Sequence, residues 1–411
     1  MPNKLNVPAM WSPEMGAVVA KQNELAAGAY STDQTFHEMR MAYDTERAFW
    51  NEGGPQPASI RENRVKTPHG QVTVRMYRPT STPALPVIVY VHGGGWVVGN
   101  LNTHSRICRI LAEETGAAVL AVDYTLSPEA RYPQAIEECV AVVQHLRTAA
   151  DEWNIDASDI SLAGDSGGAN MAFATYLHLR DVEKDAADIR CLLLYYGSYG
   201  LRDSMSIRLF GGPWDGLTEE DFAWYKNLYL RGPEDVRAPY FDILGNDLDG
   251  IPPCYIVAAA LDPLRDDSRT LAAVCEHYGV VHAFEEVSGV LHGFLHHSKI
   301  LPAAREVLES GGRFFRTVRL RGGSSTRADA AESTTQGTPV TPGGPAVSGA
   351  PGASGASVTS AVPATSGVPA SPAAPVTPGA SATSGASATS SVSATSDGPS
   401  EQRDPAPPDA V

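Results

Sequence analysis

Gly164-Asp165-Ser166-Gly167-Gly168 is the stretch of sequence that decides the fold. A strand pattern, Asp159–Ala163, precedes it, and a helical pattern, Ala169–Arg180, follows it. A strand, a sharp turn and a helix in that order form a nucleophile elbow, which raises a serine hydroxyl above the edge of a sheet. Glycines at both ends of the motif permit the close backbone approach that this turn needs. The sequence therefore predicts an α/β fold in which Ser166 is a nucleophile.

The same five residues also surround the nucleophile of trypsin-like proteases, which are all-β and disulfide-bonded. Here helical patterns flank the motif, which argues against that class. The five cysteines are odd in number and far apart along the chain. We therefore expect buried thiols rather than disulfides or a zinc site.

Short β-branched runs alternate with helical stretches from about residue 72 onward. This alternation predicts a mainly parallel sheet with helices on both faces. The expected strands are Val72–Tyr77, Val87–Val91, Ala117–Val122, Ile160–Leu162, Cys191–Tyr195, Tyr255–Ala259 and His282–Val287. The expected helices are Pro133–Thr148, Asn170–Arg180, Asp266–Tyr278 and Pro302–Val318.

The domain organisation has three expected parts. Residues 56–320 form the α/β domain, and two segments that break its alternation, residues 1–55 and the insertion at about 198–250, form a helical cap over the strand ends. The first helix could instead cover only the edge of the sheet. Residues 321–411 are rich in Ala, Ser, Thr, Pro and Gly and contain no Leu, Ile, Phe, Trp, Tyr, Met or Cys, so we expect a disordered tail.

The charge balance excludes some partners. The chain has 31 Lys+Arg against 47 Asp+Glu, a net charge of −16, which argues against binding nucleic acid or an anionic membrane surface. No apolar run is long enough to span a bilayer, and the first residues lack the basic-then-apolar pattern of an export signal. These features predict a soluble, cytoplasmic protein.

A second glycine motif, His92-Gly93-Gly94-Gly95-Trp96, directly follows an apolar strand pattern. Acyl transfer places negative charge on a carbonyl oxygen, and preorganised backbone N–H groups stabilise that charge. We expect His92-Gly93-Gly94 to form this oxyanion hole together with the N–H of Gly167. A phosphate-binding loop is disfavoured, because no Lys or Ser/Thr follows the glycines in the required positions.

The nucleophile needs a base and an orienting acid. Asp262 follows the expected strand Tyr255–Ala259, and His292 lies in the loop after His282–Val287, so both belong at the sheet edge that carries Ser166. These three residues are the expected catalytic triad. The other candidates for the acid and the base are weaker. Asp266 and Asp267 would cap the next helix, and His282 lies within an expected strand. His296 and His297 lie at an expected helix start and could be surface residues.

Aromatic residues near these motifs could shape a substrate pocket, although such residues in cap segments often serve only packing. The candidates are Trp96, Trp50, Phe210 and Trp214.

Taken together, the motifs resemble those of the hormone-sensitive-lipase-like esterases of the α/β-hydrolase fold. The resemblance rests on residues 92–96, 123–129, 164–168, 262–264 and 292–294, and the stretches 125–138, 199–204, 211–218 and 294–298 are most similar to bacterial acetyl esterases. It covers about residues 5–318. Family members commonly have Ala where this chain has Gly167, a departure that keeps the backbone N–H.

The resemblance implies a serine hydrolase that acts on short-chain acyl esters of small molecules, without a metal or an organic cofactor, with Ser166, Asp262 and His292 as its triad. The sequence does not decide between a monomer and a homodimer. Two alternatives remain at this point. The same triad could cleave an amide, a lactone or a formamide, or the fold could have become a non-catalytic ligand-binding protein.

Overall fold

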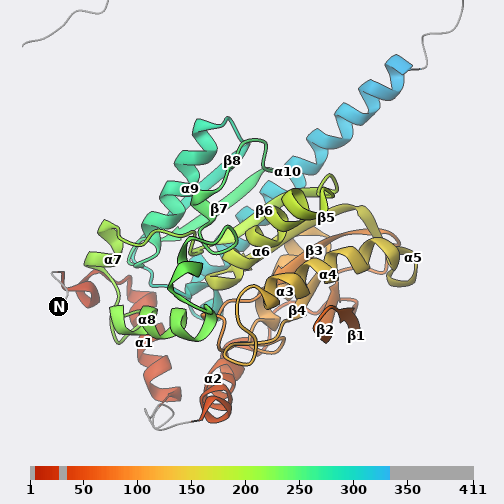
Figure 1. Ribbon diagram of the computed structural model, residues 1–411. Helices are drawn as coiled ribbons and strands as arrows, with labels where there is room; N and C mark the ends of the chain where they lie inside the picture. The colour runs from red at the N-terminus through yellow and green to blue at the C-terminus, as the bar shows by residue number, and fades with distance from the viewer. Residues whose placement is uncertain (1–4, 27–34, 334–411) are drawn as a thin grey trace, which may run out of the picture. The chain divides into compact units, whose positions relative to one another are not determined.

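The computed structural model describes residues 5–26 and 35–333, with side chains described as far as residue 321. An eight-stranded sheet with the order β1-β2-β4-β3-β5-β6-β7-β8 forms its centre (Figure 1). The strands are β1 (Ser59–Thr67), β2 (Gly70–Arg78), β3 (Leu85–Val91), β4 (Ala118–Asp123), β5 (Ile155–Asp165), β6 (Ile189–Tyr195), β7 (Cys254–Ala259) and β8 (His282–Val287). β1 and β2 pair antiparallel, β2 pairs antiparallel with β4, and all other pairs are parallel.

Helices cover both faces of the sheet. The main ones are α3 (Ser105–Thr115), α4 (Gln134–Thr148), α6 (Gly167–His178), α9 (Arg265–His277) and α10 (Pro302–Ser333), with the short α5 (Ala150–Trp153) and a π-helical turn, η2 (Leu179–Glu183), between them. The expected α/β fold, with a mainly parallel sheet flanked by helices, is confirmed.

Strand β3 shows why the sheet is buried on both sides. All seven of its residues are buried, and alternate side chains enter different cores. Val87, Val89 and Val91 join the core beneath α4 and α6, whereas Ile88 and Tyr90 join the core beneath α3 and α10. Because successive side chains point to opposite faces, a strand covered on both faces needs an uninterrupted apolar run.

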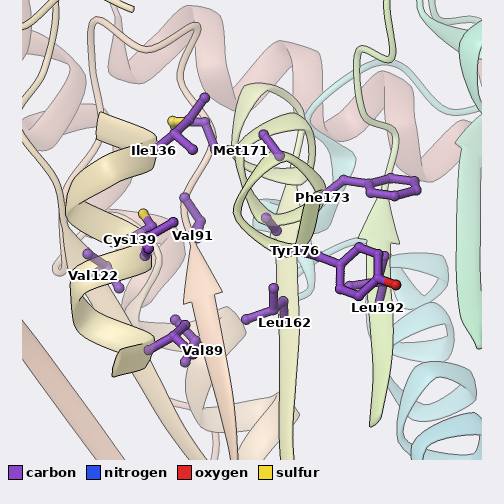
Figure 2. Close-up of a cluster of buried hydrophobic side chains, with 14 of the residues drawn as sticks. Val89, Val91, Val122, Ile136, Cys139, Leu162, Met171, Phe173, Tyr176 and Leu192 are labelled. Atoms are coloured by element: carbon purple, nitrogen blue, oxygen red, sulfur yellow. The ribbon is translucent and has the colours of Figure 1, made fainter. Parts of the chain in front are cut away.

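Figure 2 shows part of the first core, in which side chains of α4 and α6 pack onto four neighbouring strands. Cys139 of α4 is among them, and all five cysteines are buried as free thiols, as expected.

The two segments that interrupt the alternation are helical. The first contains η1 (Val7–Met10), α1 (Pro13–Leu25) and α2 (Phe36–Asn51), and the second contains α7 (Met205–Leu209), α8 (Glu219–Tyr229), η3 (Pro233–Arg237) and η4 (Ile243–Gly245). Figure 1 shows α1, α2, α7 and α8 gathered to one side of the sheet. The segments touch through two aromatic pairs, Trp11 with Trp214 and Phe36 with Trp224, each with ring centroids 6.2 Å apart.

The C-terminal helix is longer than expected. The backbone is helical to Ser333, so the predicted start of the tail at residue 321 falls inside α10. The rest of the predicted tail lies outside the described residues. Within the part of the chain that the structure describes, no helix is both long and apolar enough to cross a membrane.

Candidate active site

Ser166 lies at a sharp junction between β5 and α6. Its φ of 55° and ψ of −127° lie in a region that L-residues rarely adopt. The flanking glycines make the turn possible, because a Cβ on Gly168 would lie 2.2 Å from the carbonyl oxygen of Val91 and one on Gly164 would lie 2.5 Å from the backbone of Gly168. The backbone geometry is therefore that of a nucleophile elbow.

The structure brings the three predicted triad side chains together. His292 Nε2 lies 2.8 Å from Ser166 Oγ, and His292 Nδ1 lies 2.7 Å from Asp262 Oδ2. Asp262 is fully buried after β7, where its Oδ1 also accepts the Leu264 N–H at 2.7 Å. His292 follows β8 and is nearly buried. The arrangement can move a proton from the hydroxyl to the imidazole while the carboxylate stabilises the resulting positive charge.

The charges around His292 favour its protonated form. Burial lowers the pKa of this imidazole, but the charge and hydrogen bond of Asp262 raise it, with smaller contributions from Asp215 and Asp165. The net effect is a pKa above the ordinary 6.5. A base with such a pKa accepts a proton readily near neutral pH.

The glycine loop, residues 92–96, lies beside the elbow, but the N–H of one expected oxyanion donor already has a hydrogen-bond acceptor. The Gly93 N–H donates to Asp165 Oδ1 at 3.0 Å, so the prediction that it serves the oxyanion hole is wrong. Among the described residues, none accepts a hydrogen bond from the N–H of Gly94, Gly95 or Gly167. These three groups are available to a ligand.

His92 supports the loop from behind. Its ring stacks on Tyr124 with centroids 4.3 Å apart, and its Nδ1 lies 2.8 Å from the Gly93 oxygen. Burial, together with the charge of His104, lowers the pKa of His92 to about 3, so the ring is neutral. Its contribution to the expected oxyanion motif is thus to hold the loop in place.

Asp165 joins the elbow to this loop, a role that the sequence reasoning missed. Besides Gly93, it accepts the Tyr90 hydroxyl at 2.7 Å and lies 3.5 Å from His104 Nε2. Burial raises its pKa, but His104, Tyr90 and Gly93 outweigh burial and lower it to about 2. Its place directly before the nucleophile was the only signal in the sequence.

His104, Asp165 and His296 have potential ligand atoms within 4.8 Å of one another. Two of the lone pairs on Asp165 that a metal would need are already occupied by Tyr90 and Gly93. We therefore assign the group to the hydrogen-bonded core. His296 and its neighbour His297 are both buried in a short helix, η5 (Phe294–His297), so the prediction that they lie on the surface is wrong.

The other rival residues have structural partners. Asp267 is buried and accepts the N–H groups of Tyr199, Gly200 and Leu201, and Asp266 accepts the N–H of Ser206. Asp267 therefore anchors the loop after β6 and Asp266 anchors the start of α7, and both lie in the first turn of α9. His282 is in β8, as expected.

The four aromatic candidates have three different surroundings. Trp50 is fully buried, donates to Glu46 Oε1 at 2.7 Å and packs on His297, so its assignment to a pocket is wrong. Trp96 stacks flat on Tyr229 at 4.4 Å, and its ring lies beside Gly167. Phe210 and Trp214 line a cavity of about 1530 Å³ in the second helical segment.

The elbow, the triad geometry and the eight-stranded sheet define a serine hydrolase of the α/β class. A family model described as alpha/beta hydrolase fold matches residues 88–296, and the chain belongs to that family. An acetyl esterase of Salmonella typhi is 44% identical over 314 residues, which cover 76% of this chain and 96% of the relative.

Solved structures agree with this assignment. An esterase of the archaeon Pyrobaculum calidifontis is 28% identical with a TM-score of 0.69, over 75% of this chain and 99% of that one. A thermostable carboxylesterase cloned from a metagenomic library is 29% identical with a TM-score of 0.67, over 70% and 99% of the two chains.

Proposed function

We propose that this chain is a serine carboxylesterase that hydrolyses short-chain acyl esters through an acyl-enzyme intermediate. The observation that carries the proposal is the unbroken hydrogen-bonded series from Ser166 Oγ through His292 to Asp262, with distances of 2.8 and 2.7 Å. The similarity to an acetyl esterase and to carboxylesterases supports the ester as substrate and the short acyl group.

The first half-reaction acylates the serine. His292 Nε2 takes the proton of Ser166 as the hydroxyl oxygen attacks the ester carbonyl, and Asp262 stabilises the imidazolium. Backbone N–H groups of Gly94 and Gly167, with Gly95 in place of the occupied Gly93, receive the negative charge on the carbonyl oxygen. His292 then returns the proton to the leaving alcohol.

The second half-reaction releases the acid. Water enters, loses a proton to His292 and attacks the acyl-serine carbonyl, while the same N–H groups stabilise the second oxyanion. The bond to Ser166 Oγ breaks, and His292 protonates that oxygen. The ester and one water molecule balance the two half-reactions, and the proton is carried by His292 in both.

The test is Ser166→Ala, assayed with 4-nitrophenyl acetate. We expect a loss of turnover of about 10⁴-fold or more, because no other described group replaces the nucleophile. A fluorophosphonate should label the native chain at Ser166, and the variant should not be labelled. Undiminished turnover in a folded variant would refute the proposal.

A substrate series defines the bond that is cleaved. We expect acetate and butyrate esters to be hydrolysed faster than octanoate esters and faster than an aryl formamide or an anilide. Dominance of the formamide, the anilide or the octanoate would contradict the short-ester assignment. We further propose a cytoplasmic location, which cell fractionation would test, and a homodimer, which light scattering of the native chain would test.

A further inference from the structure

The large cavity in the second helical segment lies near the candidate active site. It has a volume of about 1530 Å³ and is lined mainly by residues between Ser198 and Phe241. Two of its wall residues reach the catalytic region. Leu264 follows the triad residue Asp262 by two positions, and the Phe241 ring lies 5.7 Å from the ring of Trp96. The wall thus comes close to Asp262 and to the Trp96 ring beside Gly167, although none of the three triad residues is part of it.

The charges on the cavity wall are opposite in sign to those of the whole chain. The wall carries five basic and three acidic side chains, whereas the chain has a net charge of −16. The basic residues are Arg131, Arg202, Arg208, Lys226 and Arg231, and the acidic ones are Asp203, Glu219 and Glu220. Local positive charge in an acidic protein favours an anionic ligand.

Several of these charges are already paired inside the protein. Arg208 forms an ion pair with Asp203, and Arg231 pairs with Asp235. Glu219 and Glu220 lie in the first turn of α8, where the helix dipole favours negative charge. They are therefore stabilised without a cation.

Lys226 and Arg202 differ from these pairs. Neither forms an ion pair with any residue in the described part of the chain. Lys226 is half-buried on α8, and burial lowers its pKa, partly offset by the charge of Asp267. The Lys226 ammonium lies 5.9 Å from the centre of the Phe222 ring and has no carboxylate within ion-pair distance among the described residues, so an anionic ligand would remove part of the cost of its desolvation.

We infer that the cavity binds the alcohol part of the ester and that Lys226, assisted by Arg202, binds a carboxylate or a phosphate carried by that alcohol. The inference rests on the proposed esterase function. A short acyl group occupies little space, so the cavity is left for the other half of the substrate. The substrate class is therefore a short-chain acyl ester of an acidic alcohol.

The experiment compares three acetate esters of similar size. 3-Acetoxybenzoate carries a carboxylate, 3-acetoxyphenyl phosphate carries a phosphate, and 3-acetoxybenzamide is neutral. The ratio of kcat/KM for each anionic ester to that for the neutral ester is measured in the native chain and in Lys226→Met. Because each ratio is compared between two proteins, differences in the intrinsic reactivity of the esters cancel.

We expect Lys226→Met to lower at least one ratio about tenfold, the value of one charge-assisted hydrogen bond. The anion with the larger decrease identifies the preferred group. Lys66→Met removes the same charge from an exposed position on β1 and should leave both ratios unchanged. Arg202→Gln, at an exposed position, should lower the same ratio by a smaller factor and repeats the test should Lys226→Met fail to fold.

Two failures are distinguishable. If the native chain does not hydrolyse the neutral ester, the proposed function is wrong. If it does, but both ratios stay within twofold of the native values in Lys226→Met and Arg202→Gln, the anionic-alcohol inference is wrong. Equal decreases in Lys66→Met would also overturn it, because the effect would then come from net charge and not from the cavity.

Discussion

At the scale of single residues, Asp165 connects Ser166, the proposed nucleophile, to the glycine loop that is proposed to stabilise the oxyanion. Its carboxylate accepts Tyr90 and Gly93 in a buried setting. Asp165→Asn removes the charge that those bonds depend on, so we expect a loss of about 2 kcal/mol in unfolding free energy and a roughly tenfold lower kcat. Urea unfolding and steady-state kinetics would measure both.

The matched control is Asp156→Asn, near the opposite end of the same strand, where the carboxylate accepts only its neighbour Ser158. This variant should keep the native stability and turnover. Equal effects in the two variants would show that Asp165 has no special role in holding the loop.

Gly167 is explained by the ring beside it. A Cβ at this position would lie 3.2 Å from Trp96 Cε2, and Trp96 cannot withdraw easily because it stacks flat on Tyr229. We therefore expect Gly167→Ala to lower the unfolding free energy by about 1 kcal/mol. In a Trp96→Phe background the smaller ring leaves space, and the same change should be neutral or stabilising. A thermal double-mutant cycle would detect the reversal, and purely additive effects would contradict it.

The pH dependence of turnover follows from His292. The imidazole must be neutral to accept the serine proton, and its pKa is above 6.5, so kcat/KM should rise with pH through a midpoint above 6.5. Asp215, a half-buried carboxyl whose own pKa burial raises to about 7, contributes to that increase. Asp215→Asn should shift the midpoint to lower pH. The exposed Asp249→Asn should not move it, and an upward shift in Asp215→Asn would refute the electrostatic argument.

Sequence reasoning at this scale found the residues that chemistry constrains most strongly. The motif around the serine and the ends of two expected strands restrict the positions of the triad residues. Sequence reasoning could therefore propose Ser166, Asp262 and His292. The hydrogen bond from the Gly93 N–H to Asp165 could not be foreseen, because it depends on which of several adjacent N–H groups faces a neighbouring carboxylate. Trp50 was misassigned for a similar reason, since a tryptophan in a helical pattern packs equally well into a core or around a cavity.

At the scale of elements, the N-terminal segment joins the cap loop to the histidine loop. Trp11 meets Trp214 edge to face, and the Ser12 N–H donates to the Gly289 oxygen at 2.9 Å, three residues before His292. Trp11→Ala should lower the unfolding free energy by about 1–3 kcal/mol and reduce kcat/KM, because the loops on both sides lose a shared contact.

The control is Met10→Ala, whose side chain is 45% exposed, and this variant should resemble the native chain in both urea unfolding and kinetics. Reduced stability of Trp11→Ala with unchanged kcat/KM would show that the segment supports the fold but not the site.

Sequence reasoning recovered best the strands that are buried on both faces. β3, β6 and β7 were expected within about two residues of their observed ends, because their apolar runs are continuous. β8 was also recovered, although its residues are only half-buried or exposed. β1 was missed because this edge strand is mostly exposed and polar. α3 was missed because arginines interrupt its apolar pattern, although Arg109 is buried and donates to backbone carbonyls of residues 51, 53 and 55.

At the scale of the whole molecule, α10 is the last element of the described chain, and it packs into the core. Phe315 of this helix is fully buried in the core beneath α3 and α10, whereas Leu320 is 77% exposed. A chain ending at Ser333 should therefore keep the native melting temperature and turnover. Phe315→Ala should cost about 3–5 kcal/mol. Calorimetry of both proteins would test this, and a marked loss of stability in the shortened chain would show that residues beyond 333 contribute to the fold.

The strained backbone at Ser166 has a consequence for the evolution of such a protein. Its dihedral angles suit glycine better than any residue with a Cβ, so the catalytic hydroxyl is retained at the expense of folding stability. A gene copy released from selection for turnover would gain robustness by replacing this serine with glycine. Descendants that kept the scaffold for another purpose are accordingly expected to lose the serine early, before the carboxylate and the imidazole that once served it.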